Sequence, residues 1–579
     1  GEKLYLYNRF QLLDRLDSFT CPTEFSSLTM ILIEDLSVLS LIMALSLLPK
    51  GKLRITGQIL MLALCICFML DMKSMKYLQS RFTFPIICSY SSEFSALSPF
   101  IDAGEIASLS ALMLIAFLLR KISIPLRIER RHVAPVLLLL TAAPWILFHN
   151  QPLRPLVDLG TRNFIRLNQL LWIDRGFSSE SVEKIKKRYP VVASQAGPSL
   201  TSDVVTRIPS TDNKPNLIIL ISESLSQIDS LRSGGVFDRV PMIDKIQADG
   251  LTLTNAVSDG PSSSYALAAL LLGYETVPTS KPLDEMPKQF PGGRNKGRNL
   301  ITVANRRGYT TTAITNAGLG FLKTGQWQKD IGFDHVFGRR SELLCDYPPA
   351  HFTHCPADEH LYTEALNLLD QQQEPVLMML TTISLHHPYQ SPDPEDAIKD
   401  EPPLNSILRY VDRTTYRFYE ALKERGFFDN GILLIVGDHR RMDPFEPEEL
   451  KQRGELDAYG RIVCSLIGPG FEPGRIDDTL FNHSDLNLLL CALMQGGDPD
   501  LRDLTRYNKS AYLKMAKPFT THLISYELGL MVVRIQDEKP VFLQVSGSLD
   551  PTDFTDNPVL EKVTAHLVLS IDWLQGRQQ

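Results

Sequence analysis

Long apolar runs set the first 150 residues apart from the rest of the chain. A helix needs roughly 20 apolar residues to cross a bilayer. Four runs approach that length: Leu28–Leu48, Ile55–Met72, Ala103–Leu119 and Val133–Phe148. A single run of this kind also fits a buried core helix, and Glu34 and Asp35 interrupt the first one. Four runs so close together predict an N-terminal transmembrane bundle over residues 1–150.

The short loops between these runs carry many basic residues: Lys50, Lys52 and Arg54 between the first two, and Arg120, Lys121, Arg127, Arg130 and Arg131 between the last two. The positive-inside rule places both loops in the cytoplasm. The chain after Phe148 is then expected outside the cytoplasm. The same parity places residues 1–27 outside as well, so we expect a further spanning helix upstream of residue 1. The alternative is an orientation without such a helix.

After a connector at residues 151–212 with an amphipathic helix, short apolar runs alternate with helical patterns. The expected buried strands are Asn216–Ser222, Pro375–Ile383, Gly431–Val436 and Ile462–Ile467, and the helical patterns between them include Tyr362–Leu369 and Ile407–Arg425. Such alternation is typical of an α/β domain with a mostly parallel central sheet. We therefore predict this domain over residues 213–510, with an α/β extension at residues 511–579.

Charge and cysteine content narrow the possible functions. The net charge of −7 argues against a general nucleic-acid binder, which needs a concentrated basic surface. Eight cysteines are too few for a disulfide scaffold in 579 residues. Cys345 and Cys355 flank a proline-rich loop and form a candidate disulfide. The alternative is a metal site made by these two cysteines with His351 and His354.

Polar side chains follow three of the expected strands. Glu223 follows the first, Asp438 and His439 follow Gly431–Val436, and the segment SLHHPY with His386 and His387 follows Pro375–Ile383. Ligands of open α/β sheets bind beyond the carboxyl ends of the strands. Carboxylate and imidazole ligands suit Zn²⁺ or Mn²⁺. The pattern therefore predicts a site for one divalent metal ion.

A candidate nucleophile stands in the segment SDGPSSSYALAALLLG. Gly260 and Pro261 break regular structure, three serines follow, and residues 265–272 are typical of a buried helix. A serine where that helix starts lies among free backbone N–H groups that favour a phosphate oxygen. Taken alone, the same serine is also compatible with an ordinary helix N-cap.

The order of these motifs resembles the alkaline-phosphatase/sulfatase superfamily. The motifs are ISES, a hydroxyl residue before a small-residue helix, SLHHPY and GDHR. Over residues 214–500 the chain is most similar to the membrane-bound branch of lipoteichoic acid synthases, phosphoglycerol transferases and phosphoethanolamine transferases. This resemblance implies that Glu223, Asp438 and His439 bind the metal ion. It also implies that Ser263, with Ser262 and Ser264 as alternatives, is both nucleophile and fourth ligand.

The resemblance further implies that His386 and His483 contact the phosphoryl group or the leaving oxygen. Two departures stand out. Most relatives in this branch have threonine at the position of Ser263. Lipoteichoic acid synthases have a Trp-Asn-Arg substrate motif where this chain has Leu322, Lys323 and Thr324. Lys323, Trp327 and His387 remain the candidate substrate-binding residues.

The expected activity is transfer of phosphoethanolamine or phosphoglycerol from a phospholipid to a cell-envelope glycan or lipid, through a covalent Ser263 phosphodiester and with one Zn²⁺ or Mn²⁺ ion. The expected location is the bacterial cytoplasmic membrane, with the catalytic domain on its outer side. One alternative is a metal-dependent phosphodiesterase of the same superfamily. Another is a non-catalytic membrane-anchored module.

Overall fold

The computed structural model describes residues 214–260, 262–273, 285–290, 299–350, 355–373, 375–386, 389–396, 401–441, 443, 445–458 and 460–495, Lys187, and the strands between residues 512 and 546. The chain divides into two units, Gly1–Ile173 and Asp174–Gln579, and every described residue lies in the second. The four predicted membrane spans lie outside the described residues. Within the described part, no helix is both long and apolar enough to span a bilayer.

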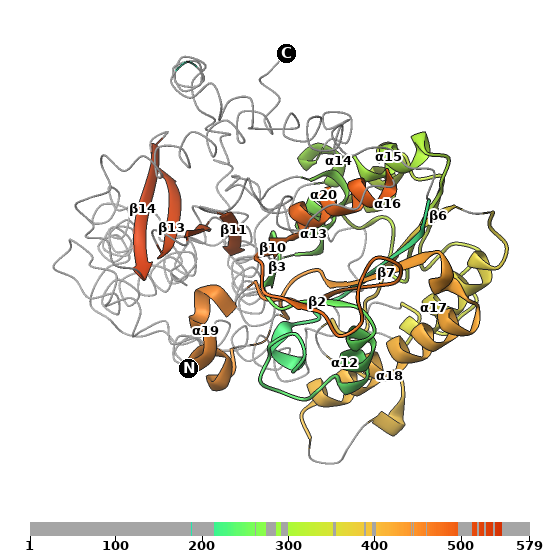
Figure 1. Cartoon of the computed structure of the whole chain (residues 1–579), viewed down its shortest axis with the longest axis horizontal. Coiled ribbons are helices and arrows are strands. Elements are labelled where there is room, and N and C mark those ends of the chain that lie inside the picture. Colours follow the sequence, from blue (N-terminus) through green and yellow to red (C-terminus); the bar gives the residue numbers. More distant parts are fainter. Residues whose placement is uncertain are drawn as a thin grey trace, which may run out of the picture. The chain divides into compact units, whose positions relative to one another are not determined.

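An eight-stranded sheet forms the centre of the α/β domain (Figure 1). Its strand order is β5-β4-β6-β1-β7-β8-β2-β9. The strands are β1 (Asn216–Ser222), β2 (Leu251–Leu253), β4 (Thr310–Thr315), β5 (His335–Phe337), β6 (Val376–Thr381), β7 (Gly431–Gly437), β8 (Cys464–Ile467) and β9 (Ile476–Asp477). Strands β5, β4, β6, β1 and β7 run parallel to one another, whereas β8 runs antiparallel to both β7 and β2. The prediction of a mostly parallel sheet is confirmed.

Strand β1 shows why the sheet is buried on both faces. Leu217, Ile219 and Ile221 belong to one hydrophobic core, and Ile218 and Leu220 belong to a second core on the other face. Because successive side chains of a strand point to opposite faces, a continuous apolar run supplies both cores. An apolar run of this kind fits a central strand.

Helices cover both faces of the sheet (Figure 1). The first core includes residues of α13 (Ser263–Leu272), α14 (Met286–Gln289), α15 (Leu300–Arg306), α16 (Thr324–Ile331) and α20 (His483–Met494). The second core includes residues of α12 (Pro241–Ala248), α17 (Asp358–Leu369) and α18 (Pro403–Glu424). The remaining described helices are α19 (Pro447–Ala458) and the short 3-10 helices η2 (Gln227–Asp229), η4 (Phe321–Lys323), η5 (Pro394–Asp396) and η6 (Phe427–Asp429).

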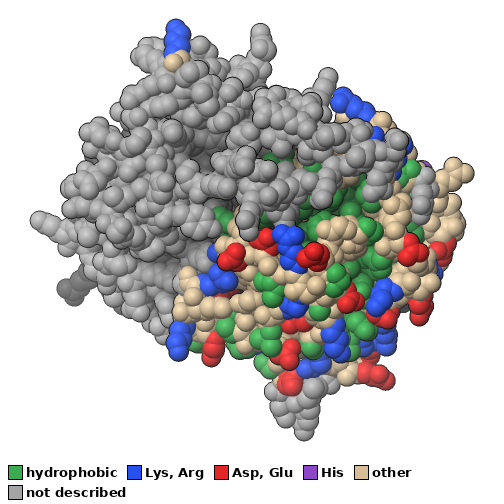
Figure 2. Space-filling view, viewed as in Figure 1, with side chains coloured by type: hydrophobic (Ala, Val, Ile, Leu, Met, Phe, Trp, Pro, Cys, Tyr) green, Lys and Arg blue, Asp and Glu red, His purple; other side chains and the backbone are tan. Residues whose placement is uncertain are grey.

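Two smaller sheets complete the described structure. Strand β3 (Ala256–Val257) pairs in parallel with β10 (Phe481–Asn482), which joins the segment before α13 to the start of α20. Strands β11 (Tyr512–Lys517), β12 (Thr520–Ser525), β13 (Gly529–Gln536) and β14 (Lys539–Ser546) form an antiparallel sheet in sequence order. On the face shown in Figure 2, acidic and basic side chains of the α/β domain are interspersed.

Candidate metal centre

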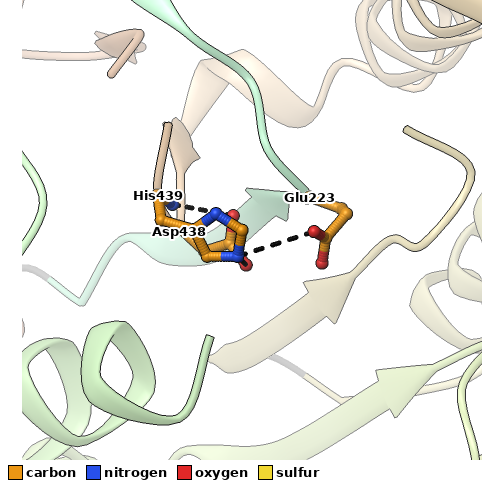
Figure 3. A group of neighbouring side chains, drawn as sticks. All are labelled: Glu223, Asp438 and His439. Atoms are coloured by element: carbon orange, nitrogen blue, oxygen red, sulfur yellow. Dashed lines mark hydrogen bonds and ion pairs between the residues drawn. The ribbon is translucent and has the colours of Figure 1, made fainter. Parts of the chain in front are cut away.

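Three of the predicted metal ligands meet at the carboxyl ends of two adjacent strands. Glu223 directly follows β1, and Asp438 and His439 directly follow β7, which pairs with β1 along its whole length. One ligand atom of each residue lies within 4.8 Å of the others, and all three side chains are buried. Figure 3 shows the Glu223 carboxylate and the His439 ring facing one another. The parallel sheet therefore brings together residues more than two hundred positions apart in the sequence.

Asp438 offers one carboxylate oxygen to a cation. Its Oδ1 accepts hydrogen bonds from the backbone N–H groups of Ser224 and His439, both at 2.8 Å. Its Oδ2 is buried and has no hydrogen-bond partner among the described residues. A buried carboxylate oxygen without a donor is costly unless a positive charge is placed beside it. This orphaned oxygen fits a metal ligand.

His439 is oriented by the backbone that follows it. Its Nδ1 lies 2.9 Å from the Arg440 carbonyl oxygen, so the ring donates its Nδ1–H there. Nε2 is then the basic nitrogen, and it lies 3.3 Å from Asp438 Oδ2 and 3.6 Å from Glu223 Oε1. Histidine ligands of metal ions are commonly fixed in this way by a hydrogen bond from the other ring nitrogen.

The pKa values show the electrostatic cost of the site. Burial raises the pKa of Glu223, and the neighbouring Asp438 charge raises it further. Burial lowers the pKa of His439, but the carboxylates of Asp438 and Glu223 outweigh burial and raise it. Two carboxylates and one imidazole suit Zn²⁺ or Mn²⁺. A divalent cation would balance the two carboxylates, so the residues fit such an ion.

Sequence reasoning did not single out two residues that hold Glu223 in place. Ser224 Oγ donates to Glu223 Oε1 at 2.7 Å, and the Glu223 N–H donates to Thr382 Oγ1 at 3.0 Å. Ser224 has a left-handed backbone with φ of 56°. Such strained non-glycine residues cluster at functional sites. The motif ISES contains Ser224, but its role depends on a backbone conformation that the motif does not reveal.

The candidate nucleophile lies on a segment that is hydrogen-bonded to the residues after β7. Ser263 is the first residue of α13, and Ser262 precedes it as the N-cap. Upstream, the Ser258 hydroxyl lies 2.8 Å from the Asp438 carbonyl oxygen. The side-chain hydroxyls of Ser262 and Ser264 are hydrogen-bonded to each other at 2.9 Å. The assignment of Ser263 as nucleophile and fourth ligand remains a prediction.

His386 and His387 follow β6, the other neighbour of β1. His386 is half-buried, and its charge acts to lower the pKa of Glu223, which places the two side chains in the same region. His387 lies outside the described residues. His386 therefore lies near Glu223, and the roles proposed for His386 and His387 remain predictions.

His483 is buried at the start of α20 and is fully engaged by backbone groups. Its Nδ1 accepts from the Asp259 N–H at 3.3 Å, and its Nε2–H donates to the Gly437 carbonyl oxygen at 2.9 Å. Burial is the main cause that lowers its pKa to about 4. A neutral ring with both nitrogens occupied is poorly suited to proton transfer. This geometry fits a residue that ties the segment before Ser263 to the end of β7.

We expect His483 to make the protein sensitive to acid. A folded-state pKa of about 4 lies below the unfolded value of 6.5, so the unfolded chain binds more protons between these pH values. Stability from this residue is present above pH 6.5 and falls by up to about 3 kcal/mol as the pH drops to 4. His483→Gln should weaken this dependence in urea unfolding measured across that range. His335→Gln, which changes an exposed histidine, should leave it as in the wild type.

The two candidate substrate residues on the segment after β4 occupy different environments. Lys323 is exposed and pairs with Glu285 Oε1 at 2.9 Å. Leu322 and Lys323 both have left-handed backbones, with φ of 48° and 54°. Trp327 is completely buried, and its indole N–H donates to the Phe290 carbonyl oxygen at 2.7 Å. Trp327 therefore has the position of a core residue, whereas Lys323 lies at the surface.

The candidate disulfide between Cys345 and Cys355 is not formed in the structure. Cys345 is exposed, whereas Cys355 is buried in the domain, so the two side chains lie in different environments. His351 and His354 of the alternative metal site lie outside the described residues. We expect a thiol reagent to modify Cys345 in the native protein and Cys355 only after unfolding, which peptide mass analysis would show. If neither cysteine reacts until a reductant is added, the two cysteines form a disulfide in the native protein.

Comparison with known proteins agrees with the motif order. The sulfatase family profile matches residues 215–461, which hold Glu223, Ser263, Asp438 and His439. The α/β domain belongs to the alkaline-phosphatase/sulfatase superfamily. A solved structure of an alkaline-phosphatase-superfamily protein from Vibrio parahaemolyticus has the same fold, with a TM-score of 0.51 and 19% identity over 64% of this chain and 90% of that one.

Two curated relatives are lipoteichoic acid synthases. The chain is 23% identical to lipoteichoic acid synthase 1 of Bacillus subtilis over 168 residues, which cover 28% of this chain and 26% of that protein. It is 28% identical to lipoteichoic acid synthase of Staphylococcus saprophyticus over 196 residues, covering 32% of this chain and 28% of that protein. The matched segment thus spans about a quarter of each relative.

Proposed function

We propose that this chain is a metal-dependent phosphotransferase that moves phosphoethanolamine or phosphoglycerol from a phospholipid to an alcohol of an envelope glycan or lipid. The observation that carries the proposal is the buried Glu223–Asp438–His439 cluster, with its orphaned Asp438 oxygen, beside a segment that leads to Ser263. The lipoteichoic acid synthases among the relatives support a phosphoalcohol as the transferred group. The expected location is the outer side of the bacterial cytoplasmic membrane.

Glu223, Asp438 and His439 would hold the divalent cation, with the Ser263 hydroxyl as a fourth ligand. When bound, such an ion supplies a Lewis acid for a phosphoryl oxygen and lowers the pKa of a coordinated hydroxyl. The residues around the ion have the complementary task of holding the ligands still. Ser224 and Thr382 fix Glu223, and the Arg440 carbonyl fixes the tautomer of His439.

The transfer proceeds in two balanced steps. Ser263 Oγ attacks phosphorus, so an Oγ–P bond forms and the bond between phosphorus and the diacylglycerol oxygen breaks. The serine proton ends on that leaving oxygen, which departs as diacylglycerol. In the second step an acceptor alcohol attacks phosphorus, the Oγ–P bond breaks, and the acceptor proton returns to Ser263. Splitting the reaction through a covalent intermediate is a general use of an activated hydroxyl.

His386 is the better placed of the two proposed proton-transfer residues. It follows β6 and lies half-buried near Glu223, whereas the nitrogens of His483 are both held by backbone groups. An imidazole near neutral pH can give a proton to the leaving oxygen and take one from the acceptor alcohol. We therefore assign this role to His386.

Peptide mass analysis of the 579-residue chain after exposure to defined phospholipids tests the proposal. Phosphatidylethanolamine and phosphatidylglycerol are offered separately, each with and without added Zn²⁺ or Mn²⁺. The expected result is a phosphoethanolamine or phosphoglycerol adduct on Ser263 that needs the metal ion and disappears on addition of an acceptor alcohol. Release of the free phosphoalcohol with no transfer product would identify a phosphodiesterase instead. Absence of any adduct or turnover with metal bound would favour a non-catalytic module.

A further inference from the structure

A buried group of charged side chains lies behind the metal centre and has no part in the mechanism above. Its central member is Arg441, two residues after His439, whose side chain is fully buried. Its Nη1 pairs with Asp229 Oδ2, its Nη2 lies 2.5 Å from Glu446 Oε1, and its Nε lies 3.5 Å from Asp443 Oδ2. A planar guanidinium can bind several carboxylates in fixed directions. Arg441 is thus hydrogen-bonded to Asp229 and Glu446 and forms a longer ion pair with Asp443.

The first of these acidic side chains belongs to the segment that carries Glu223. Asp229 is completely buried in η2, six residues after Glu223, and it also pairs with Arg239 at 3.0 Å. A second link runs between the same segments, because Ser226 Oγ accepts from the Arg441 N–H at 2.8 Å and donates to the Ser224 carbonyl at 3.0 Å. The segment after β1 is therefore fastened to the segment after β7 at two points.

The second acidic side chain leads to the segment that carries His386. The phenol of Tyr389, three residues after His386, donates a hydrogen bond to Asp443. Tyr389 is buried and has a left-handed backbone with φ of 63°. Burial raises the pKa of Tyr389 well above its ordinary value, and Asp443 raises it further, so the phenol stays protonated and remains a donor. A strained residue persists only where its surroundings hold it.

The structure assigns to Arg441 the role of a positioning residue. Through Asp229 it fixes the segment of Glu223, through Asp443 and Tyr389 it fixes the segment of His386, and its own backbone continues that of Asp438 and His439. Three strands of the sheet, β6, β1 and β7, are adjacent in that order, and one buried guanidinium joins the segments that follow them. The metal ligands and the proposed proton-transfer histidine are thereby held in one geometry.

The effect on the metal ion can be measured without any assumption about the reaction. Removal of groups that orient metal ligands typically weakens metal affinity by roughly 10- to 100-fold. Arg441→Lys keeps the positive charge but cannot hold three carboxylates, so we expect Mn²⁺ or Zn²⁺ affinity of the whole chain to fall about tenfold or more. Titration against a chromophoric chelator measures this affinity directly.

Two sets of contacts, here called arms, lead from Arg441: one through Asp229 to the Glu223 segment, and one through Asp443 and Tyr389 to the His386 segment. Tyr389→Phe changes only the second arm and is the milder change. It removes one hydroxyl from the arm that leads to His386 and leaves the arm that leads to Glu223 intact. We expect metal affinity to stay within about twofold of wild type, and kcat for the transfer to fall about tenfold with KM little changed. Tyr362→Phe is the matched control, because Tyr362 is also buried and bonds Thr415 at 3.2 Å on the α17–α18 side of the sheet.

The kcat result rests on the proposed function, whereas the metal affinities do not. If the wild type binds metal but transfers nothing, the positioning role is still tested by comparing the metal affinity of Arg441→Lys with that of Tyr362→Phe. The role is overturned if Arg441→Lys lowers the unfolding temperature and leaves metal affinity at the wild-type value. If Arg441→Lys fails to fold, Tyr389→Phe still tests the positioning role. A kcat equal to that of the wild type would show that the contacts through Asp443 and Tyr389 do not position His386. A fall in kcat that is absent from Tyr362→Phe would support that role.

Discussion

Asp438→Asn is expected to abolish metal binding while leaving the fold intact. Asp438 accepts hydrogen bonds from two backbone N–H groups, and both are made to Oδ1. The side-chain carbonyl oxygen of an asparagine can still accept both hydrogen bonds. The other oxygen, which has no hydrogen-bond donor among the described residues, becomes an NH₂ group that cannot bind a cation. We expect metal affinity to fall at least about 100-fold and transfer by roughly 10³-fold or more. Chelator competition and steady-state rates measure the two effects.

Asp412→Asn provides the matched control for this variant. Asp412 is also buried and also accepts two backbone N–H groups, from Met242 at 3.0 Å and Ile243 at 2.7 Å. It lies within α18 and is not among the proposed ligands, and burial raises its pKa to about 6. Its substitution should cost stability and leave metal affinity unchanged. Equal loss of metal in both variants would mean that Asp438 acts only through the fold.

The strands that carry the site were predictable because they are continuous apolar runs. β1 and β7 are buried on both faces, and a run of leucine, isoleucine and valine is what such a position requires. Strand β4 escaped prediction because its sequence TTTAIT looks polar. Thr311, Thr312 and Thr315 are nonetheless buried, and the hydroxyl of Thr311 is satisfied by Asp334 Oδ2 at 2.8 Å. Only the folded chain supplies that acceptor.

The cluster of candidate metal ligands could be predicted, but the groups that orient these side chains could not. Glu223, Asp438 and His439 each follow a recognisable strand, and the carboxyl ends of neighbouring parallel strands lie together. The pairing of Arg441 with Asp229 joins residues 212 positions apart through irregular segments. Likewise, the low pKa of His483 results from burial and from backbone partners that no local pattern identifies. Sequence therefore predicted the chemistry of the ligands better than the state of the residues around them.

Ser263→Ala is expected to eliminate both the covalent adduct and the transfer, with metal still bound. In the proposed mechanism the side chain of Ser263 supplies the attacking oxygen, and loss of a nucleophile typically lowers turnover by roughly 10⁴-fold or more. Glu223, Asp438 and His439 remain in the variant, so metal affinity should fall by less than in Asp438→Asn. Intact-mass analysis after exposure to phospholipid and chelator competition measure the two quantities separately.

Ser262→Ala and Ser264→Ala decide the register of the nucleophile. The hydroxyls of Ser262 and Ser264 are hydrogen-bonded to each other at 2.9 Å, and each substitution removes the same hydrogen bond from the start of α13. If that bond is only structural, the two variants should show the same modest loss of stability and keep the adduct on Ser263. An adduct that persists in Ser263→Ala and vanishes in one of the other two would move the nucleophile to that serine. The mutual bond makes this outcome chemically less favourable, because a hydroxyl must leave its partner before it can attack phosphorus.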